Sequence, residues 1–166
     1  MKKLLFIIAL TSSVTLTHAQ TLLGDFQKKY QHREGVNSVT ISGDLFKISS
    51  TILKYSGDKD SEALSRICSG INSMYVLNME ERYFDHIDDE LRILKSDLSK
   101  SNLNLLMTVK ERTETVEVYS EMKNEEVVNG IVLFIRKDRE FTLLEIKGTI
   151  HMKDLSVLTE NHSTWH

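Results

Sequence analysis

Residues 127–150 restrict the possible folds more than any other part of this sequence. Positions 127–135 are mostly apolar, five charged residues follow at 136–140, and positions 141–150 resume with apolar and polar residues in alternation. β-Branched and aromatic residues on both sides of a polar break are typical of a β-hairpin. Because the first segment is apolar at both parities, we predict a central strand that is covered on both faces.

The second segment of this hairpin has a clear two-residue period. Leu144 and Ile146 alternate with Glu145 and Lys147. Successive side chains of a strand point to opposite faces of its sheet. We therefore predict that the two apolar residues face the core and that the two charged residues face solvent.

The rest of the chain changes from helical to strand periodicity. Apolar spacing predicts helices at 22–33, 45–55, 61–70 and 80–100, and strands at 36–42, 71–79, 103–110 and 116–122. The last two strands and the hairpin would form an antiparallel meander. The predicted class is α+β, with a single mixed or antiparallel sheet of about six strands and helices mainly on one face. The pattern leaves open whether an early strand inserts between the later ones.

Two predicted helices carry an apolar stripe that should pack on the sheet. In 45–55 the stripe consists of Leu45, Ile48, Ile52 and Tyr55, and in 80–100 of Phe84, Ile87, Leu91, Leu94 and Leu98. Steps of three and four residues place each set on one side of its helix.

The first nineteen residues have the features of a secretory signal. Lys2 and Lys3 precede an apolar segment, and small residues near Ala19 suit a cleavage site. The apolar segment is shorter than the roughly 20 residues that a membrane span requires. We therefore expect a cleaved signal peptide at 1–19, and one soluble domain at 20–166 in the periplasm or outside the cell.

Composition narrows the classes of partner and cofactor. Removal of 19 from 166 residues leaves 147, and the loss of two lysines changes the net charge from −3 to −5. A mildly acidic chain without a basic segment argues against nucleic acid as a partner. Cys68 is the only cysteine, so no internal disulfide is expected. We find no phosphate-binding, zinc-binding or nucleophile motif, so no catalytic residue, metal ligand or cofactor is assigned.

One sheet face is a candidate partner surface. If the helices cover a single face, the other face would carry Leu106, Tyr119, Val132 and Phe134. A sheet face that is this apolar seldom stays open to water. We therefore expect a protein partner or a homodimer there.

The densest polar cluster is a weaker candidate for chemistry. On a continuous helix His86 and Glu90 would lie four residues apart on one side, with Asp85 nearby. Such a group could bind a metal with further ligands, or act in acid–base catalysis. The competing interpretation is a solvated acidic face opposite the apolar stripe.

Several stretches together resemble a known family. They are Glu34-Gly35-Val36, residues 38–42, Leu45-Phe46, Val76-Leu77, residues 103–111 and 144–150, and Leu155. This pattern resembles the exported Bacteroidetes proteins of unknown function of the DUF4252 type, over nearly the whole mature chain. The resemblance implies an envelope or secreted α+β domain without an established activity, and it carries over no catalytic residues. Many relatives look like lipoproteins with a cysteine after the signal, which this chain lacks.

These observations favour an exported, non-catalytic binding or interaction module of the cell envelope. One alternative is a small hydrolase or metal-dependent enzyme that uses the His86 region. Another is a structural subunit of an envelope assembly that buries its open sheet face.

Overall fold

The computed structural model describes residues 18–101 and 103–155, and the predicted signal peptide lies almost wholly outside them. The elements are α1 (His18–Tyr30), β1 (Val36–Ser42), α2 (Gly43–Lys54), α3 (Lys59–Gly70), β2 (Ile71–Glu80), the 3-10 turn η1 (Glu81–Tyr83), α4 (Ile87–Lys100), β3 (Leu103–Lys110), β4 (Glu114–Asn124), β5 (Val127–Lys137) and β6 (Glu140–His151). The fold is α+β, as the sequence predicts.

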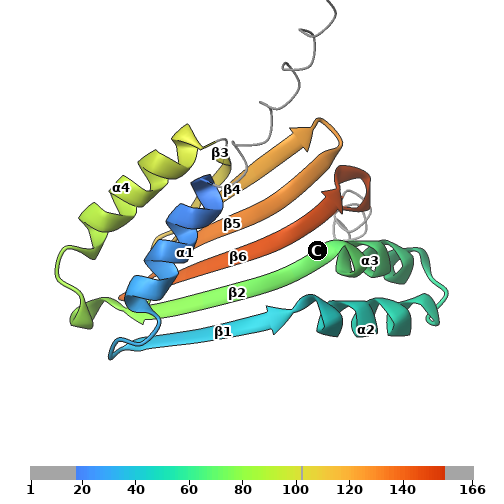
Figure 1. Ribbon diagram of the computed structural model, residues 1–166, viewed down its shortest axis with the longest axis horizontal. Coiled ribbons are helices and arrows are strands. Elements are labelled where there is room, and N and C mark those ends of the chain that lie inside the picture. Colours follow the sequence, from blue (N-terminus) through green and yellow to red (C-terminus); the bar gives the residue numbers. More distant parts are fainter. Residues whose placement is uncertain (1–17, 102, 156–166) are drawn as a thin grey trace, which may run out of the picture.

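The strands form a single antiparallel sheet with the order β1-β2-β6-β5-β4-β3 (Figure 1). β3 to β6 are consecutive neighbours, which confirms the predicted meander. β2 pairs with β6, so the early β1–β2 pair extends the meander at its end and does not insert into it. This pairing places β6 and β5 in the middle of the sheet and leaves β1 and β3 as its edges.

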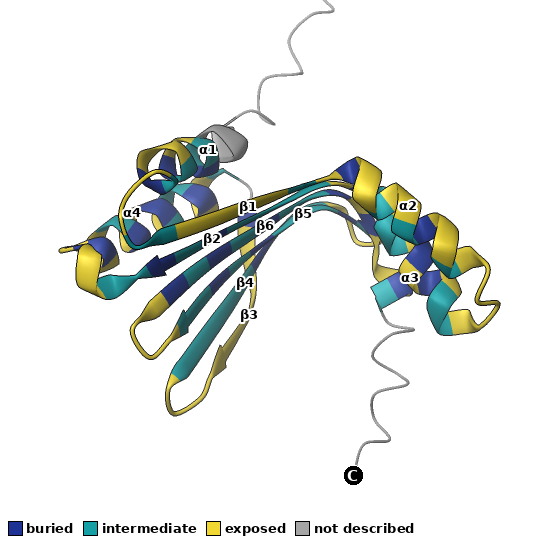
Figure 2. Cartoon of the chain, turned by 90° about the horizontal axis from the view of Figure 1, so that it is seen from below, coloured by how far each residue is buried: buried dark blue, intermediate teal, exposed yellow. Residues whose placement is uncertain are grey.

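Two helices, α1 and α4, cover one face of the sheet (Figure 2). The predicted stripe of α4 is confirmed, because Phe84, Ile87, Leu91, Leu94 and Leu98 are all buried. Together with Leu23, Phe26 and Tyr30 of α1 they form one core with residues of the covered sheet face. The continuous helix expected at 80–100 is wrong at its start. β2 runs on to Glu80, and His86 takes a left-handed φ of 64° just before α4.

The other two helices lie beyond one end of the sheet. α2 and α3 pack on each other through small residues, and the Ser50 and Ser65 hydroxyls are 3.0 Å apart. The predicted stripe of α2 faces solvent, because Leu45, Ile48, Ile52 and Tyr55 are 53%, 59%, 65% and 87% exposed. Helical spacing identified the stripe but not its surroundings. Figure 2 shows this α2–α3 unit beyond the strand ends, on the side away from α1 and α4.

Two glycines allow the α2–α3 unit to meet the sheet closely. A Cβ atom on Gly70 would lie 2.1 Å from the Thr149 carbonyl oxygen, and one on Gly148 would lie 2.2 Å from the Gly70 carbonyl oxygen. Gly148 also has φ of 157°, at the edge of the region that favours glycine. The end of α3 is therefore held against β6 by direct backbone contact.

Candidate binding surface

The three aromatic and aliphatic residues predicted for an open face lie on the covered one. Tyr119, Val132 and Phe134 are only 5%, 2% and 2% exposed and belong to the core beneath α1 and α4. Their assignment to an uncovered face is therefore wrong. β5 is apolar at both parities, so its sequence contains no information on which parity the helices cover. Leu106 is 52% exposed but falls at the β-bulge of β3, where the register gives it no cross-strand partner.

On the other face of the sheet, residues paired from strand to strand form an apolar row that crosses all six strands. Residues in register are, from edge to edge, Val39, Val76, Leu144, Leu133, Val118 and Met107. We call these six residues the apolar row. Val39 and Met107 at the edges are 55% and 51% exposed, and the four central residues are half-buried by their neighbours. No described helix covers this row.

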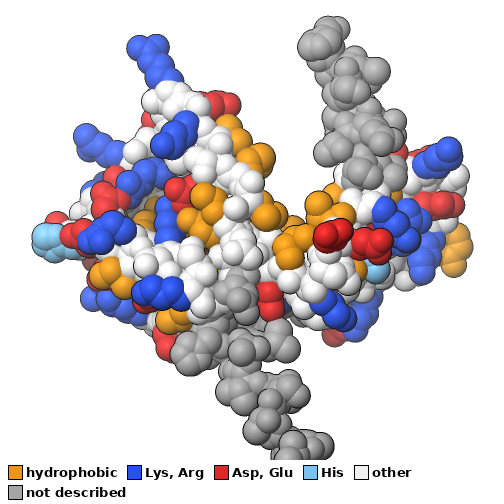
Figure 3. Space-filling view, turned by 90° about the horizontal axis from the view of Figure 1, so that it is seen from above, with side chains coloured by type: hydrophobic (Ala, Val, Ile, Leu, Met, Phe, Trp, Pro, Cys, Tyr) orange, Lys and Arg blue, Asp and Glu red, His pale blue; other side chains and the backbone are white. Residues whose placement is uncertain are grey.

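The registered rows on either side of the apolar row are also uncharged. One consists of Ile41, Met74, Ile146, Ile131, Ser120 and Asn104, and the other of Asn37, Asn78, Thr142, Ile135, Val116 and Val109. The next row toward the strand ends distant from the α2–α3 unit is charged. It consists of Glu80, Glu140, Lys137 and Glu114. Figure 3 shows hydrophobic side chains along the hollow between the sheet and the α2–α3 unit.

The covered face, in contrast, contains charged residues. Glu145 is 4% exposed, and its carboxylate accepts a hydrogen bond of 2.7 Å from the Gln27 amide of α1. Lys147 Nζ lies 3.3 Å from the same carboxylate. The expectation that Glu145 faces solvent while Leu144 and Ile146 face the core is therefore wrong. Helix α1 supplies the Gln27 amide as a hydrogen-bond partner for Glu145. Such pairing allows the sheet face that contains charged residues to be the buried one.

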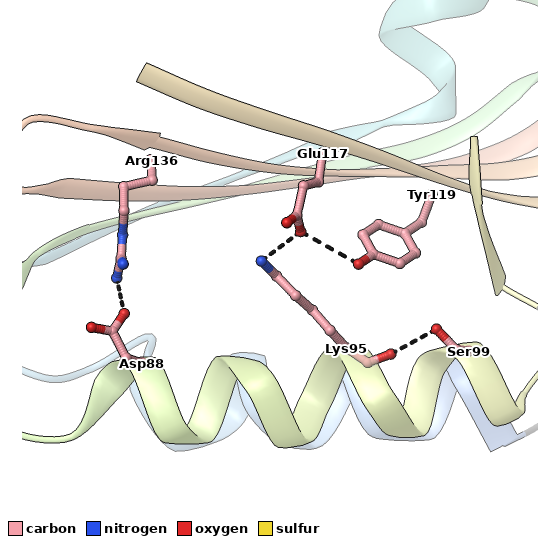
Figure 4. A network of polar contacts seen from close by, with 6 residues as sticks. All are labelled: Asp88, Lys95, Ser99, Glu117, Tyr119 and Arg136. Atoms are coloured by element: carbon pink, nitrogen blue, oxygen red, sulfur yellow. Dashed lines mark hydrogen bonds and ion pairs between the residues drawn. The ribbon is translucent and has the colours of Figure 1, made fainter. Parts of the chain in front are cut away.

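A polar network joins α4 to the covered face (Figure 4). Lys95 Nζ lies 2.5 Å from the Glu117 carboxylate, which also accepts a 3.3 Å hydrogen bond from the Tyr119 hydroxyl. Burial, with the nearby Glu117 charge, raises the pKa of Tyr119 to about 12. Further along α4, Arg136 pairs with Asp88. Glu117 and Arg136 of this face are thus paired across the joint with α4.

A hollow of about 440 Å³ opens beside this network. Leu91, Phe134 and Phe141 at its floor are already 5%, 2% and 2% exposed, so an apolar ligand would gain little further burial there. Lys95, Glu117 and Arg136 in its wall already have charged partners. The hollow is therefore best explained as the solvated margin of the joint between α4 and the sheet.

The polar cluster around His86 does not form the predicted arrangement. His86 precedes α4 in a left-handed conformation, so it and Glu90 do not share a helical face. Asp85 and His86 are exposed. Glu90 instead binds α1: its carboxylate accepts a 2.6 Å hydrogen bond from Lys29 Nζ and a second from the Tyr30 hydroxyl. These hydrogen bonds lower the pKa of Glu90, while burial and the Glu90 charge raise the pKa of Tyr30.

Other sites of possible chemistry are few in the described part of the chain. Within residues 18–101 and 103–155, no three His, Cys, Asp or Glu side chains are grouped so that they could hold a metal ion. Cys68 is half-buried in α3, and burial raises the pKa of its thiol, which disfavours the nucleophilic thiolate. Among the described helices, none is long and apolar enough to cross a bilayer.

Comparison with known proteins gives one match. A sequence model of the family described as "Domain of unknown function (DUF4252)" matches residues 30–158. No curated protein and no solved structure matches the chain.

Proposed function

We propose that this chain, which belongs to the DUF4252 family of domains of unknown function, is an exported binding module of the bacterial cell envelope. In this proposal residues 1–19 are a signal peptide, and the mature protein starts at Gln20 as one domain in the periplasm or outside the cell. Its uncovered sheet face is the surface that contacts another protein.

The observation that supports this proposal is the apolar row. It crosses six strands without a polar residue, and no described helix lies over it. Exposed apolar patches larger than a few hundred Å² usually mark interaction sites in soluble proteins. In this proposal the apolar row and the uncharged rows beside it form such an interaction site.

The chemistry of the face favours a protein over other partners. It has no lysine or arginine in its three rows, so it offers nothing to a phosphate backbone. Small ligands bind in concave pockets. The 440 Å³ hollow beside α4 lies on the opposite face of the sheet. A broad apolar surface with uncharged polar margins is suited to the surface of a protein partner.

In-cell photo-crosslinking tests the proposal. A photoreactive phenylalanine analogue replaces Leu133 at the centre of the apolar row, in the full-length chain expressed in its own host. We expect irradiation to yield covalent adducts with a protein. The matched control places the same analogue at Ile93, which is 54% exposed on α4, on the other side of the sheet.

The identity of the adduct separates the remaining alternatives. A structural subunit would be linked at Leu133 to the components of one stable assembly, whereas a binding module would be linked to a partner that dissociates. Failure of Leu133 to give any protein adduct above the level of Ile93 would contradict the use of this face. A substrate hydrolysed by the protein and lost on His86→Ala would favour the enzyme instead.

A further inference from the structure

We infer that the uncovered face binds a second copy of this chain, so that two sheets pack face to face around a two-fold axis. This inference rests on the proposed function and names the partner of the same surface. It follows from the composition of the face, from its size and from the position of the α2–α3 unit.

The face is compatible with itself. In a two-fold dimer the same patch of both copies meets, so each residue must tolerate its own counterpart. A charged residue at the centre would oppose an identical charge, at a cost in free energy. The three uncharged rows contain no such residue, and the first charges occur in the row that begins at Glu80.

The size of the face is close to that of a stable interface. Three rows spaced two residues apart on six strands span roughly 20 Å by 29 Å, or about 600 Å² of flat area. A standard protein interface buries about 800 Å² of accessible surface on each partner. The corrugation of the side chains and the flanking α2–α3 unit supply the difference.

The α2–α3 unit selects between two possible directions of the axis. It lies beyond one end of the strands and on the uncovered side of the sheet (Figure 2). An axis along the strands would bring the α2–α3 units of both copies to the same end, where they would collide. An axis across the strands places each unit beyond the free strand ends of the other copy. The hollow in Figure 3 would then receive the partner's sheet.

An axis across the strands runs parallel to the apolar row. Each strand then faces the same strand of the other copy, so Leu133 of β5 lies opposite its own counterpart. Facing sheets pack about 10 Å apart. This gives a specific distance that can be tested by cross-linking.

The first test is the oligomeric state of the purified protein in sedimentation velocity over a wide concentration range. We expect a reversible dimer for the natural chain and for Ile93→Asp on α4. Leu133→Asp should weaken the dimer at least about 100-fold, because each copy would bury an unpaired carboxylate. No described helix lies over Leu133, so the monomer should keep its circular dichroism spectrum.

The second test is site-specific. Cys68→Ser removes the natural thiol, and Leu133→Cys then adds one at the centre of the face. In the proposed dimer the two facing sheets are about 10 Å apart. A bismaleimide with a spacer of about 8 Å should therefore link two copies that carry Leu133→Cys. The same reagent should not link Ile93→Cys.

The outcomes distinguish the inference from the proposed function. A monomer at all concentrations whose Leu133 position links to a different protein overturns the dimer and leaves the binding module intact. A monomer without any adduct overturns both. A dimer that survives Leu133→Asp uses another surface and overturns the inference. A link within one molecule to residues 156–166 would show that the chain's own end covers the face, and would also overturn it.

Discussion

The two faces of the sheet differ in a way that reverses the usual relation between charge and burial. The covered face includes Glu145, Glu117 and Arg136, yet it lies beneath α1 and α4. The uncovered face has an unbroken apolar row and two uncharged rows beside it. The more apolar of the two faces is therefore the one that no described helix covers.

This difference has a physical explanation. Charges on the covered face have partners: Gln27 for Glu145, and Lys95 for Glu117. Buried polar groups that are hydrogen-bonded are tolerated, whereas unpaired ones are costly. The three rows of the uncovered face contain no charged residue, and its apolar row contains no polar side chain. Burial of the apolar row would therefore carry little desolvation cost. The comparison teaches that charged residues on a sheet do not identify its solvent-facing side when the covering helices supply their partners.

The largest expected effect comes from neighbouring leucines of β6 that point to opposite faces. Leu143 is 0% exposed on the covered face, whereas Leu144 is half-buried in the apolar row. Leu143→Ala should lower the free energy of unfolding by about 2–5 kcal/mol, because it leaves a cavity in the core. Leu144→Ala should cost about 1 kcal/mol or less in the monomer, since little packing is lost there. Urea unfolding at low protein concentration measures both. Equal losses would show that the second face is also covered.

A smaller effect is expected from the buried carboxylate of the covered face. Glu145→Ala should destabilise the protein by about 1–3 kcal/mol, because the Gln27 amide loses its acceptor in a partly buried position. Glu145→Gln keeps an acceptor oxygen and should recover part of this loss. Thermal unfolding of both variants provides the measurement. A stabilising Glu145→Ala would contradict the view that this face depends on paired polar groups.

The α1–α4 contact on the covered side should respond to acid. The pKa of Glu90 is lowered by its hydrogen bonds from Lys29 and Tyr30. A depressed folded-state pKa gives stability that is present above the ordinary value of 4.5 and is lost as the pH falls through the folded-state value. Glu90→Gln should remove this part of the acid dependence. The side chain of Glu90 is 35% exposed, so the effect is limited to about 1 kcal/mol or less. Unfolding curves from pH 7 to pH 3 would show it, and an unchanged slope would argue against the pairing.

The smallest effect is expected on α2. Ile48 is 59% exposed on the solvent-facing stripe of α2. Ile48→Lys should change the free energy of unfolding by no more than about 0.5 kcal/mol. A loss of 2 kcal/mol or more in the free energy of unfolding would mean that this side of α2 is buried in solution. The comparison of covered and uncovered surfaces would then have to include α2.

Several elements could be predicted because their signals are local. The meander follows from the period of two after residue 103, and the buried side of α4 follows from steps of three and four from Phe84 to Leu98. The start of α4 could not be predicted, because only the pairing of Glu80 with Glu140 and the left-handed His86 interrupt an otherwise helical pattern. The sequence pattern pointed to the wrong parity for the uncovered face for a different reason. Val132 and Leu133 are equally apolar neighbours, and nothing in β5 itself distinguishes them.

The sequence by itself determined the number and type of the elements, the antiparallel meander and the fact that both sides of its central strand are apolar. Only the tertiary structure decided which side α1 and α4 cover, and therefore which side no described helix covers. The physical reason is that side-chain periodicity is a property of neighbouring residues. The choice of face depends instead on contacts between distant ones, such as Gln27 with Glu145 and Lys29 with Glu90.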